Sequence, residues 1–279
     1  FEGAWERGAL ELDKRGNYAD PDKVHRISHE GPYFRSRGYG NASYSPQGTP
    51  VLFQAGSSDR GKQFGGKHGE CIFLGGGSIE KLAGQVKALR EEAMANGRDP
   101  NSIKVMSAFS CVVAATEEEA RRKHREILDA QTPDVAVASY AWFTGLDLSS
   151  YDPATKMSAL HTELSQTQVA RFGDQTVGDV LKDWHAHGVR TNPFVGTPEQ
   201  IADVMCAMAD GADLDGFLFT PLIQPTSTID FVQQVMPVLR ARGVAASEYE
   251  GDSLRERLIG TPSPILGDDH PGAGYRKLG

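Results

Sequence analysis

Short apolar runs that end in glycine or serine alternate with amphipathic segments in the first half of the chain. Residues 50–58 (PVLFQAGSS) and 70–77 (ECIFLGGG) each have the pattern of a buried strand that runs into a turn. A helix-compatible segment follows each run. The second segment, residues 78–97, keeps apolar residues at helical spacing: Ile79, Leu82, Val86, Leu89 and Ala93. The pattern predicts two consecutive strand–helix units.

A third unit begins with residues 102–116 (SIKVMSAFSCVVAAT), which predict a strand. It passes into a helix at Thr116, where Thr116 and Glu119 have the spacing of a capping box. Beyond this helix the alternation breaks, and residues 131–192 carry mixed apolar and polar segments. We predict that this stretch is an inserted, mainly helical region that shapes a substrate pocket or a lid.

The alternation resumes at residues 197–200 (TPEQ), in which the threonine is an N-cap, the proline takes the first helical position and the glutamine completes a capping box. A buried strand over residues 215–221 follows, and then an amphipathic helix over residues 227–243 with a kink at Pro237. About four such strands alternating with helices predict an α/β fold. Its parallel sheet is covered by helices and is either open or closed into a barrel.

The two flanking segments have a different texture. Residues 20–50 are rich in Pro, Gly, His and Tyr and predict a hairpin or an extended surface excursion. The tail, residues 244–279, is polar and rich in Pro and Gly. It is expected either to lie along a neighbouring subunit of a homo-oligomer or to be disordered at its end.

Composition narrows the class of protein. The 279 residues are enough for one large domain or two ordinary ones, and 39% hydrophobic with 24% charged residues argues against a coiled coil or a disordered chain. The formal net charge is −8 and there is no long basic run, which disfavours a nucleic-acid or anionic-membrane partner. A small-molecule ligand is the better expectation.

The cysteines and the apolar runs bear on localisation. Cys71, Cys111 and Cys206 are widely spaced and form no CxxC pair, so we expect buried thiols in a cytoplasmic protein. No apolar run reaches the roughly 20 residues that cross a bilayer, and the first residues lack the pattern of a signal peptide. The chain begins with Phe1 in a helical pattern, so its true beginning is expected to lie upstream.

The clearest candidate for chemistry is the turn in QAGSS. Gly56 allows a tight turn and close approach of the backbone to a ligand, while Ser57 and Ser58 place hydroxyls beside the free N–H groups of a helix start. These features together suit a phosphate dianion. An ordinary strand–helix turn with a serine N-cap explains the same residues.

Three other features of the sequence are candidates for ligand or metal binding. The glycines of residues 75–77 either approach a ligand or form a permissive turn, and they lack the dinucleotide-binding spacing. His185 and His187 form an HxH pair without a nearby third ligand, so no metal site is predicted. The aromatic group within the insertion forms either a pocket wall or buried packing: Tyr140, Trp142 and Phe143.

Several blocks in a fixed order resemble the luciferase-like flavin monooxygenases. They are SPQGTPVLFQAGSSDRGKQFGGKHGECIF, GRDP, VGTPEQIADVM, DGFLFTP and DFVQQVMPVLRARG. The similarity is strongest to the branch that contains the nitrilotriacetate (component A), EDTA and dibenzothiophene-sulfone monooxygenases and long-chain alkane monooxygenase. It runs through most of the chain outside the insertion.

The resemblance implies a (β/α)8 TIM-like barrel of the bacterial luciferase type. In this family, reduced FMN (FMNH2) supplied by a separate NAD(P)H:flavin reductase reacts with O2, and a small organic substrate is oxygenated. The loop that matches QAGSS helps to hold the flavin phosphate, which implies that Gly56, Ser57 and Ser58 bind the cofactor. The segment FEGAWE resembles the end of the fourth strand–helix region, so this chain is expected to cover about strands five to eight and to be incompetent alone.

Site residues beyond the cofactor loop follow less directly. Relatives commonly place a histidine just before GTPEQ, and the nearest one here is His187, several residues earlier, as the catalytic candidate. An acidic chelator would require cations such as Arg171 and Arg190, and an aromatic sulfone would require the aromatic group of the insertion. The competing hypotheses are a noncatalytic flavin-binding or structural fragment and an F420-dependent oxidoreductase.

Overall fold

The computed structural model describes residues 1–279 except 44, 57, 163–165, 188–191 and 277–279. For four further residues (167, 168, 171 and 187) it describes the backbone only. The chain divides into two compact units. Unit 1 comprises residues 1–108, 207–218 and 246–279, and unit 2 comprises residues 109–206 and 219–245.

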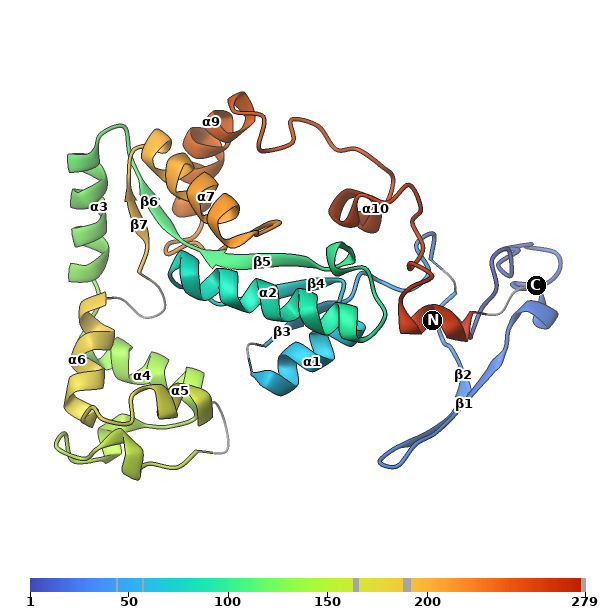
Figure 1. The fold of residues 1–279 in the computed structure, drawn as a ribbon, viewed down its shortest axis with the longest axis horizontal. Helices are drawn as coiled ribbons and strands as arrows, with labels where there is room; N and C mark the ends of the chain where they lie inside the picture. The colour runs from blue at the N-terminus through green and yellow to red at the C-terminus, as the bar shows by residue number, and fades with distance from the viewer. Residues whose placement is uncertain (44, 57, 163–165, 188–191, 277–279) are drawn as a thin grey trace. The chain divides into compact units, whose positions relative to one another are not determined.

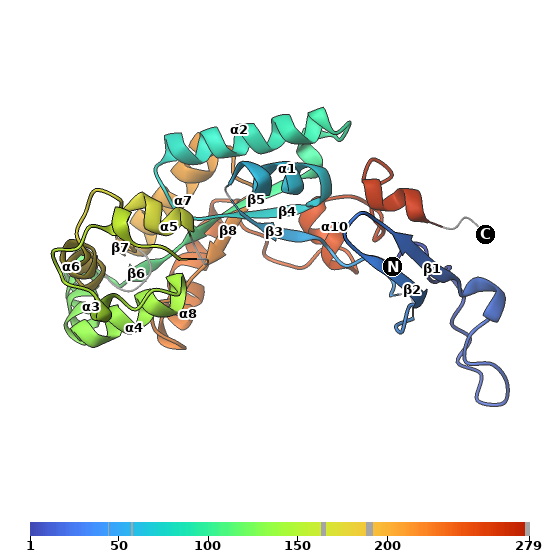
Figure 2. The ribbon, with the colours of Figure 1, turned by 90° about the horizontal axis from the view of Figure 1, so that it is seen from below.

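Unit 1 is built on a four-stranded sheet with the strand order β3-β4-β5-β8 (Figure 1 and Figure 2). The strands are β3 (Phe53–Ala55), β4 (Cys71–Leu74), β5 (Lys104–Phe109) and β8 (Gly216–Phe219), the last residue of β5 and of β8 being assigned to unit 2. Strands β3, β4 and β5 are parallel. Asp215 N donates to Val105 O, and Thr220 N donates to Phe109 O. Residue numbers therefore increase in the same direction along β5 and β8, so β8 is parallel as well.

Helices α1 (Asp59–His68) and α2 (Ile79–Ala95) cover one face of this sheet, as Figure 2 shows. The apolar residues predicted from helical spacing are buried in α2, and Ile72 and Val105 face them from paired positions of β4 and β5. Each helix starts at the carboxyl end of a strand. The predicted parallel sheet covered by helices is therefore confirmed.

The flanking segments of the sequence also belong to unit 1. Strands β1 (Arg26–Glu30) and β2 (Arg35–Tyr39) form the predicted antiparallel hairpin. The tail contains α10 (Leu254–Ile259), whose N-cap Ser253 and Glu256 form a reciprocal capping box. The described residues of this unit also form 3-10 turns at Pro21–Lys23, Pro100–Ser102 and Pro271–Tyr275.

Unit 2 pairs β6 (Cys111–Val113) in parallel with β7 (Phe194–Gly196). The segment predicted as one strand over residues 102–116 is thus divided at Ser110 between two sheets. At this division, Phe194 N donates to Ser110 O, and Ser110 Oγ donates to Thr220 O at 2.5 Å. β5 ends because the chain changes its pairing partner there, whereas the apolar pattern of the sequence continues. The spacing of apolar residues therefore did not predict this boundary.

The helices of unit 2 lie within the predicted insertion and on both sides of it. They are α3 (Glu117–Asp129), α4 (Pro133–Thr144), α5 (Gln166–Arg171), α6 (Val177–His187), α7 (Pro198–Ala212, whose end belongs to unit 1), α8 (Thr226–Asp230) and α9 (Met236–Ala241), with 3-10 turns at Leu148–Ser150 and Met157–Ala159. Thr116 and Thr197 cap α3 and α7 as predicted. The Thr197–Gln200 box is reciprocal, with Thr197 N donating to Gln200 Oε1 at 2.9 Å.

The helix predicted over residues 227–243 is interrupted by a π-helical turn, Phe231–Val235, between α8 and α9. Pro237 has no N–H to donate to a carbonyl one turn earlier. The wider π-helical turn accommodates the proline without that hydrogen bond. The expected kink is therefore a π-helical segment.

Candidate functional site

The turn between β3 and α1 has the geometry of an anion-binding helix start. Ser58 is the N-cap of α1 and accepts a hydrogen bond from Gly61 N at 3.1 Å, which leaves its own hydroxyl hydrogen free to be donated. The N–H groups of Asp59 and Arg60 lie in the first turn, where a helix offers them no acceptor. Ser58 is exposed, and Ser57 lies outside the described residues.

Two glycines bring this loop against the helix. A Cβ atom on Gly61 would lie 3.2 Å from both the carbonyl carbon and the oxygen of Gly56, closer than side chains normally pack. The backbone of the turn therefore approaches the first turn of α1 because neither residue carries a side chain. The partial positive charge of the helix start and the exposed hydroxyl face the same loop, an arrangement suited to a phosphate.

Charged side chains flank this helix start. The Asp59 carboxylate pairs with Lys62 Nζ at 2.8 Å, and hydrogen bonding to that lysine lowers the pKa of Asp59. Arg60 is exposed beside them. Because Asp59 is already paired with Lys62, the Arg60 guanidinium can form an ion pair with an incoming anion.

Gln54, the polar residue of β3 before the turn, was not predicted from the sequence to be a functional residue. Its Nε2 donates to Ala55 O at 3.2 Å, while its Oε1 is buried and has no hydrogen-bond donor among the described residues. A Cβ atom on Gly65 of α1 would lie 3.3 Å from that Oε1. Only the burial of this amide beneath the helix distinguishes it, and no sequence pattern encodes that burial.

The neighbouring helix α2 starts at the same edge of the sheet. Because β3 and β4 are parallel neighbours, the turn at Gly56 and the glycines of residues 75–77 lie at their adjacent carboxyl ends. Those three glycines are exposed, and Ser78 caps α2 by accepting from Lys81 N at 3.3 Å. A Cβ atom on Gly75 would contact nothing within 4 Å, so packing does not demand glycine there. Its role in ligand binding stays a prediction.

The three predicted aromatic residues lie in different surroundings. Tyr140 is fully buried in the apolar core formed by residues 140–180, and burial raises its pKa. Trp142 is 73% exposed and Phe143 is 39% exposed. The ring of Trp184 contacts Tyr140 edge-on at 5.1 Å and lies 6.5 Å from Phe143. Tyr140 thus packs the core, whereas Trp142 and Phe143 are exposed, and their role in substrate binding stays a prediction.

The remaining predicted side chains are only partly described. His187 ends α6 and Arg171 ends α5, but their side chains, like the whole of Arg190, lie outside the described residues. His185 Nε2 lies 3.0 Å from Gln131 O. Within the described parts of the chain, no three His, Cys, Asp or Glu side chains gather as a metal site.

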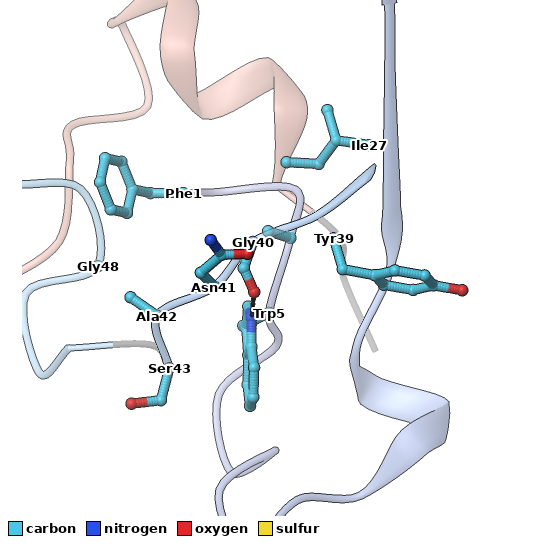
Figure 3. Close-up of a pocket in the computed structure, with 10 residues that line it drawn as sticks. Phe1, Trp5, Ile27, Tyr39, Gly40, Asn41, Ala42, Ser43 and Gly48 are labelled. Carbon is cyan, nitrogen blue, oxygen red and sulfur yellow. Dashed lines mark hydrogen bonds between the residues drawn. The ribbon is translucent and has the colours of Figure 1, made fainter. Parts of the chain in front are cut away.

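A separate pocket of about 410 Å³ lies beside the β1–β2 hairpin (Figure 3). Phe1, Trp5, Ile27 and Tyr39 supply much of its wall, and Trp5 Nε1 donates to Gly40 O at 3.1 Å. None of the predicted site residues lines it. Its walls are those of an apolar surface hollow.

The thiols agree with the prediction at two positions of three. Cys71 and Cys111 are buried, and burial raises the pKa of each to about 12, so both are protonated at neutral pH. Cys206 is half-buried, and all three are free. None of the described helices combines the length and the apolar character needed to cross a bilayer.

Comparison with known proteins places these features in context. The family model described as Luciferase-like monooxygenase matches residues 4–213. A long-chain alkane monooxygenase of Geobacillus thermodenitrificans is 35% identical over 100% of this chain and 60% of its own length. A dimethyl-sulfide monooxygenase of Hyphomicrobium sulfonivorans is 34% identical over 99% and 59%, respectively.

Among solved structures, a riboflavin lyase with modified FMN and the substrate riboflavin is 73% identical. It superposes with a TM-score of 0.90 over 99% of this chain and 62% of its own. The structure of long-chain alkane monooxygenase superposes with a TM-score of 0.83 at 35% identity. The chain therefore spans about three fifths of the length of these relatives.

Proposed function

Because this chain belongs to the luciferase-like monooxygenase family and has its α/β fold, we propose that it forms part of an FMNH2-dependent enzyme whose substrate is riboflavin. One observation supports riboflavin as the substrate. The sequence identity to the riboflavin lyase is 73%, against about 35% to the alkane and dimethyl-sulfide monooxygenases. The same strands, in this proposal, are about the last four of a (β/α)8 barrel.

The start of α1 fits the cofactor phosphate. Gly56, Ser57 and Ser58 would hold it, through the backbone of the turn, the serine hydroxyls and the first-turn N–H groups. Arg60 would add a charge-assisted contact. FMN and riboflavin differ by that phosphate, so this turn would distinguish the cofactor from the substrate. Bound reduced FMN would supply the electrons that activate O2.

A separate NAD(P)H:flavin reductase would deliver the reduced cofactor, since the relatives include an FMNH2-dependent dimethylsulfone monooxygenase and a monooxygenase component A. His187 at the end of α6 would act as a proton carrier. The insertion of residues 131–192 would exclude water above the substrate.

The test combines the complete protein with a flavin reductase, NADH, FMN and O2, and follows riboflavin by liquid chromatography with mass detection. Riboflavin should disappear only when FMN and NADH are both present. A long-chain alkane and dimethyl sulfide serve as comparison substrates. Stable riboflavin with consumption of either comparison substrate would show that the substrate assignment is wrong, and turnover without FMN would show that the cofactor assignment is wrong.

A further inference from the structure

A groove of about 460 Å³ lies within unit 2, separate from the turn at α1. Helices α3 and α8 both pack against β6, and the groove opens between them. Lys123 and Ile127 of α3 and its C-cap residue Ala130 line it at helical spacing, and Ile223 and Ser227 line it from the other side. Its volume lies in the range of about 300–1,000 Å³ typical of small-molecule sites.

The apolar part of the groove suits a flat ring. Its floor is the buried strand β6, and Ile127 and the 44%-exposed Ile223 stand on opposite walls. Such exposed aliphatic surface inside a concavity favours an apolar ligand over water.

The polar groups of the groove favour a ligand with several hydroxyl groups. Gln131 Oε1 is buried without a hydrogen-bond donor among the described residues, so an O–H group of a ligand would satisfy it. Ser227 Oγ accepts from Ile223 N at 3.1 Å and keeps its hydrogen for a ligand. Both residues line the groove.

The charges of the groove disfavour an anion. Lys123 Nζ lies 3.3 Å from Asp230 Oδ2 and also donates to Val113 O, so its charge is already paired. Asp230 Oδ1 accepts from Gln234. The remaining charged lining residue is the carboxylate of Glu126, which pairs with Arg122. A phosphate dianion would meet two carboxylates and no free cation of the lining.

We propose that this groove binds a neutral ligand made of an apolar ring system and a polyhydroxyl chain, and that riboflavin, rather than FMN, is its ligand. The assignment rests on the proposed function for the identity of the molecule, and on the groove for its chemistry. The two flavins would then be sorted by charge, FMN at the start of α1 and riboflavin between α3 and α8.

The test is calorimetric titration of the complete protein, loaded with FMN, with two probes: riboflavin and lumiflavin, the same ring without the polyhydroxyl chain. Gln131→Leu should weaken riboflavin binding about three- to tenfold, the loss of one hydrogen bond, and leave lumiflavin unchanged. Ile127→Trp fills the groove and should weaken both probes at least about tenfold. Gln233→Leu and Val232→Trp, at exposed positions outside the lining, are the matched controls.

Circular dichroism establishes that each variant is folded before it is titrated. Riboflavin turnover with unchanged riboflavin affinity in both groove variants would overturn the groove and leave the proposed function standing. The expected affinity losses without any turnover of riboflavin by the wild type would support the groove and contradict the proposed function. Equal weakening of riboflavin by the control variants, or no binding of either probe, would overturn the groove.

Discussion

At the scale of single residues, Arg255 in the tail is a buried and tightly held side chain. It is 1% exposed, and its guanidinium bonds both oxygens of the buried Glu70, with Nε–Oε1 at 2.8 Å and Nη2–Oε2 at 3.0 Å. It also donates to the carbonyl oxygens of Gln47, Thr49 and Pro264. One arginine thereby fastens the tail to the strand region of unit 1.

Replacing Arg255 with Ala should lower the free energy of unfolding by about 3–5 kcal/mol, because Glu70 would be left buried and unpaired. Arg255→Lys should recover only part of the loss, since an ammonium group cannot reproduce the bidentate contact. Urea unfolding followed by circular dichroism measures both. Arg257→Ala, at an exposed position of α10, is the control and should cost less than about 1 kcal/mol. Equal losses at the two positions would contradict the role of the buried pair.

The second prediction at this scale concerns the cofactor turn. Replacing Ser57 and Ser58 together with Ala should weaken FMNH2 binding by the complete protein roughly ten- to several-hundredfold, if two hydrogen bonds to a charged group are lost at about 0.7–1.8 kcal/mol each. Anaerobic titration with reduced FMN gives the affinity. Ser149→Ala, in a turn of unit 2, is a matched serine substitution away from the turn. Unchanged affinity in the double variant would remove the phosphate assignment.

At the scale of elements, the contact between α1 and α2 depends on a glycine. A Cβ atom on Gly66 would lie 2.5 Å from Glu92 Cβ and 3.0 Å from the Glu92 carbonyl carbon. The two helices therefore approach more closely than side chains at this position would permit. Gly84 in α2 is different, since a Cβ atom there would meet nothing within 4 Å.

The two glycines should respond to alanine with opposite signs. Gly66→Ala should destabilise the protein by about 1–3 kcal/mol, because the clash with the Glu92 backbone exceeds the gain in helix propensity. Gly84→Ala should stabilise it by about 0.5–1 kcal/mol, since only the propensity term acts. Thermal and urea unfolding of both variants provide the comparison. Stabilisation by both substitutions would show that the helices separate freely at Gly66.

A further prediction at this scale concerns residues 131–192, the predicted insertion. Its helices enclose their own apolar core around Tyr140, yet Trp142 remains exposed. Substrate binding to the complete protein should slow amide hydrogen exchange in this stretch, because a ligand-covered lid opens less often. The carboxyl-terminal half of α2 serves as the internal reference. Slowed exchange confined to the amino-terminal ends of the strands would contradict a lid.

At the scale of the whole molecule, one face of the main sheet is covered by helices and the other is partly exposed. Helices α1 and α2 pack on the face of Ile72 and Val105, whereas the opposite face carries Phe53, 43% exposed and stacked on Phe73 at 5.2 Å. Leu218 of β8 is also 43% exposed. A sheet with apolar residues on both faces is typical of a parallel sheet that is buried on both sides.

The protein of residues 1–279 alone should therefore bind a hydrophobic dye and associate as its concentration rises. The double substitution Phe53→Asp with Leu218→Asp should raise the concentration at the midpoint of association at least about tenfold, since burial of each side chain contributes about 1.5–3 kcal/mol. Sedimentation velocity measures the association, and Met94→Asp on exposed α2 surface is the control. A monomer without dye binding at high concentration would contradict this account.

Local patterns were sufficient for most elements of this fold. The helical spacing of α2, the capping threonines of α3 and α7, and the short apolar strands before glycine turns all specify their own conformation through neighbouring residues. The turn at Gly56 and Ser58 is local in the same sense, because a strand end, a glycine and a serine N-cap lie within a few residues. Its phosphate-binding role stays a prediction.

Long-range pairing decided the rest. The division of β5 from β6 at Ser110 depends on hydrogen bonds to Phe194 and Thr220, and the burial of Arg255 depends on Glu70, 185 residues earlier. The aromatic group of the insertion was separated into a core residue, Tyr140, and exposed neighbours only by packing. These outcomes follow from contacts between residues far apart in the chain, which the spacing of residues along one segment does not encode.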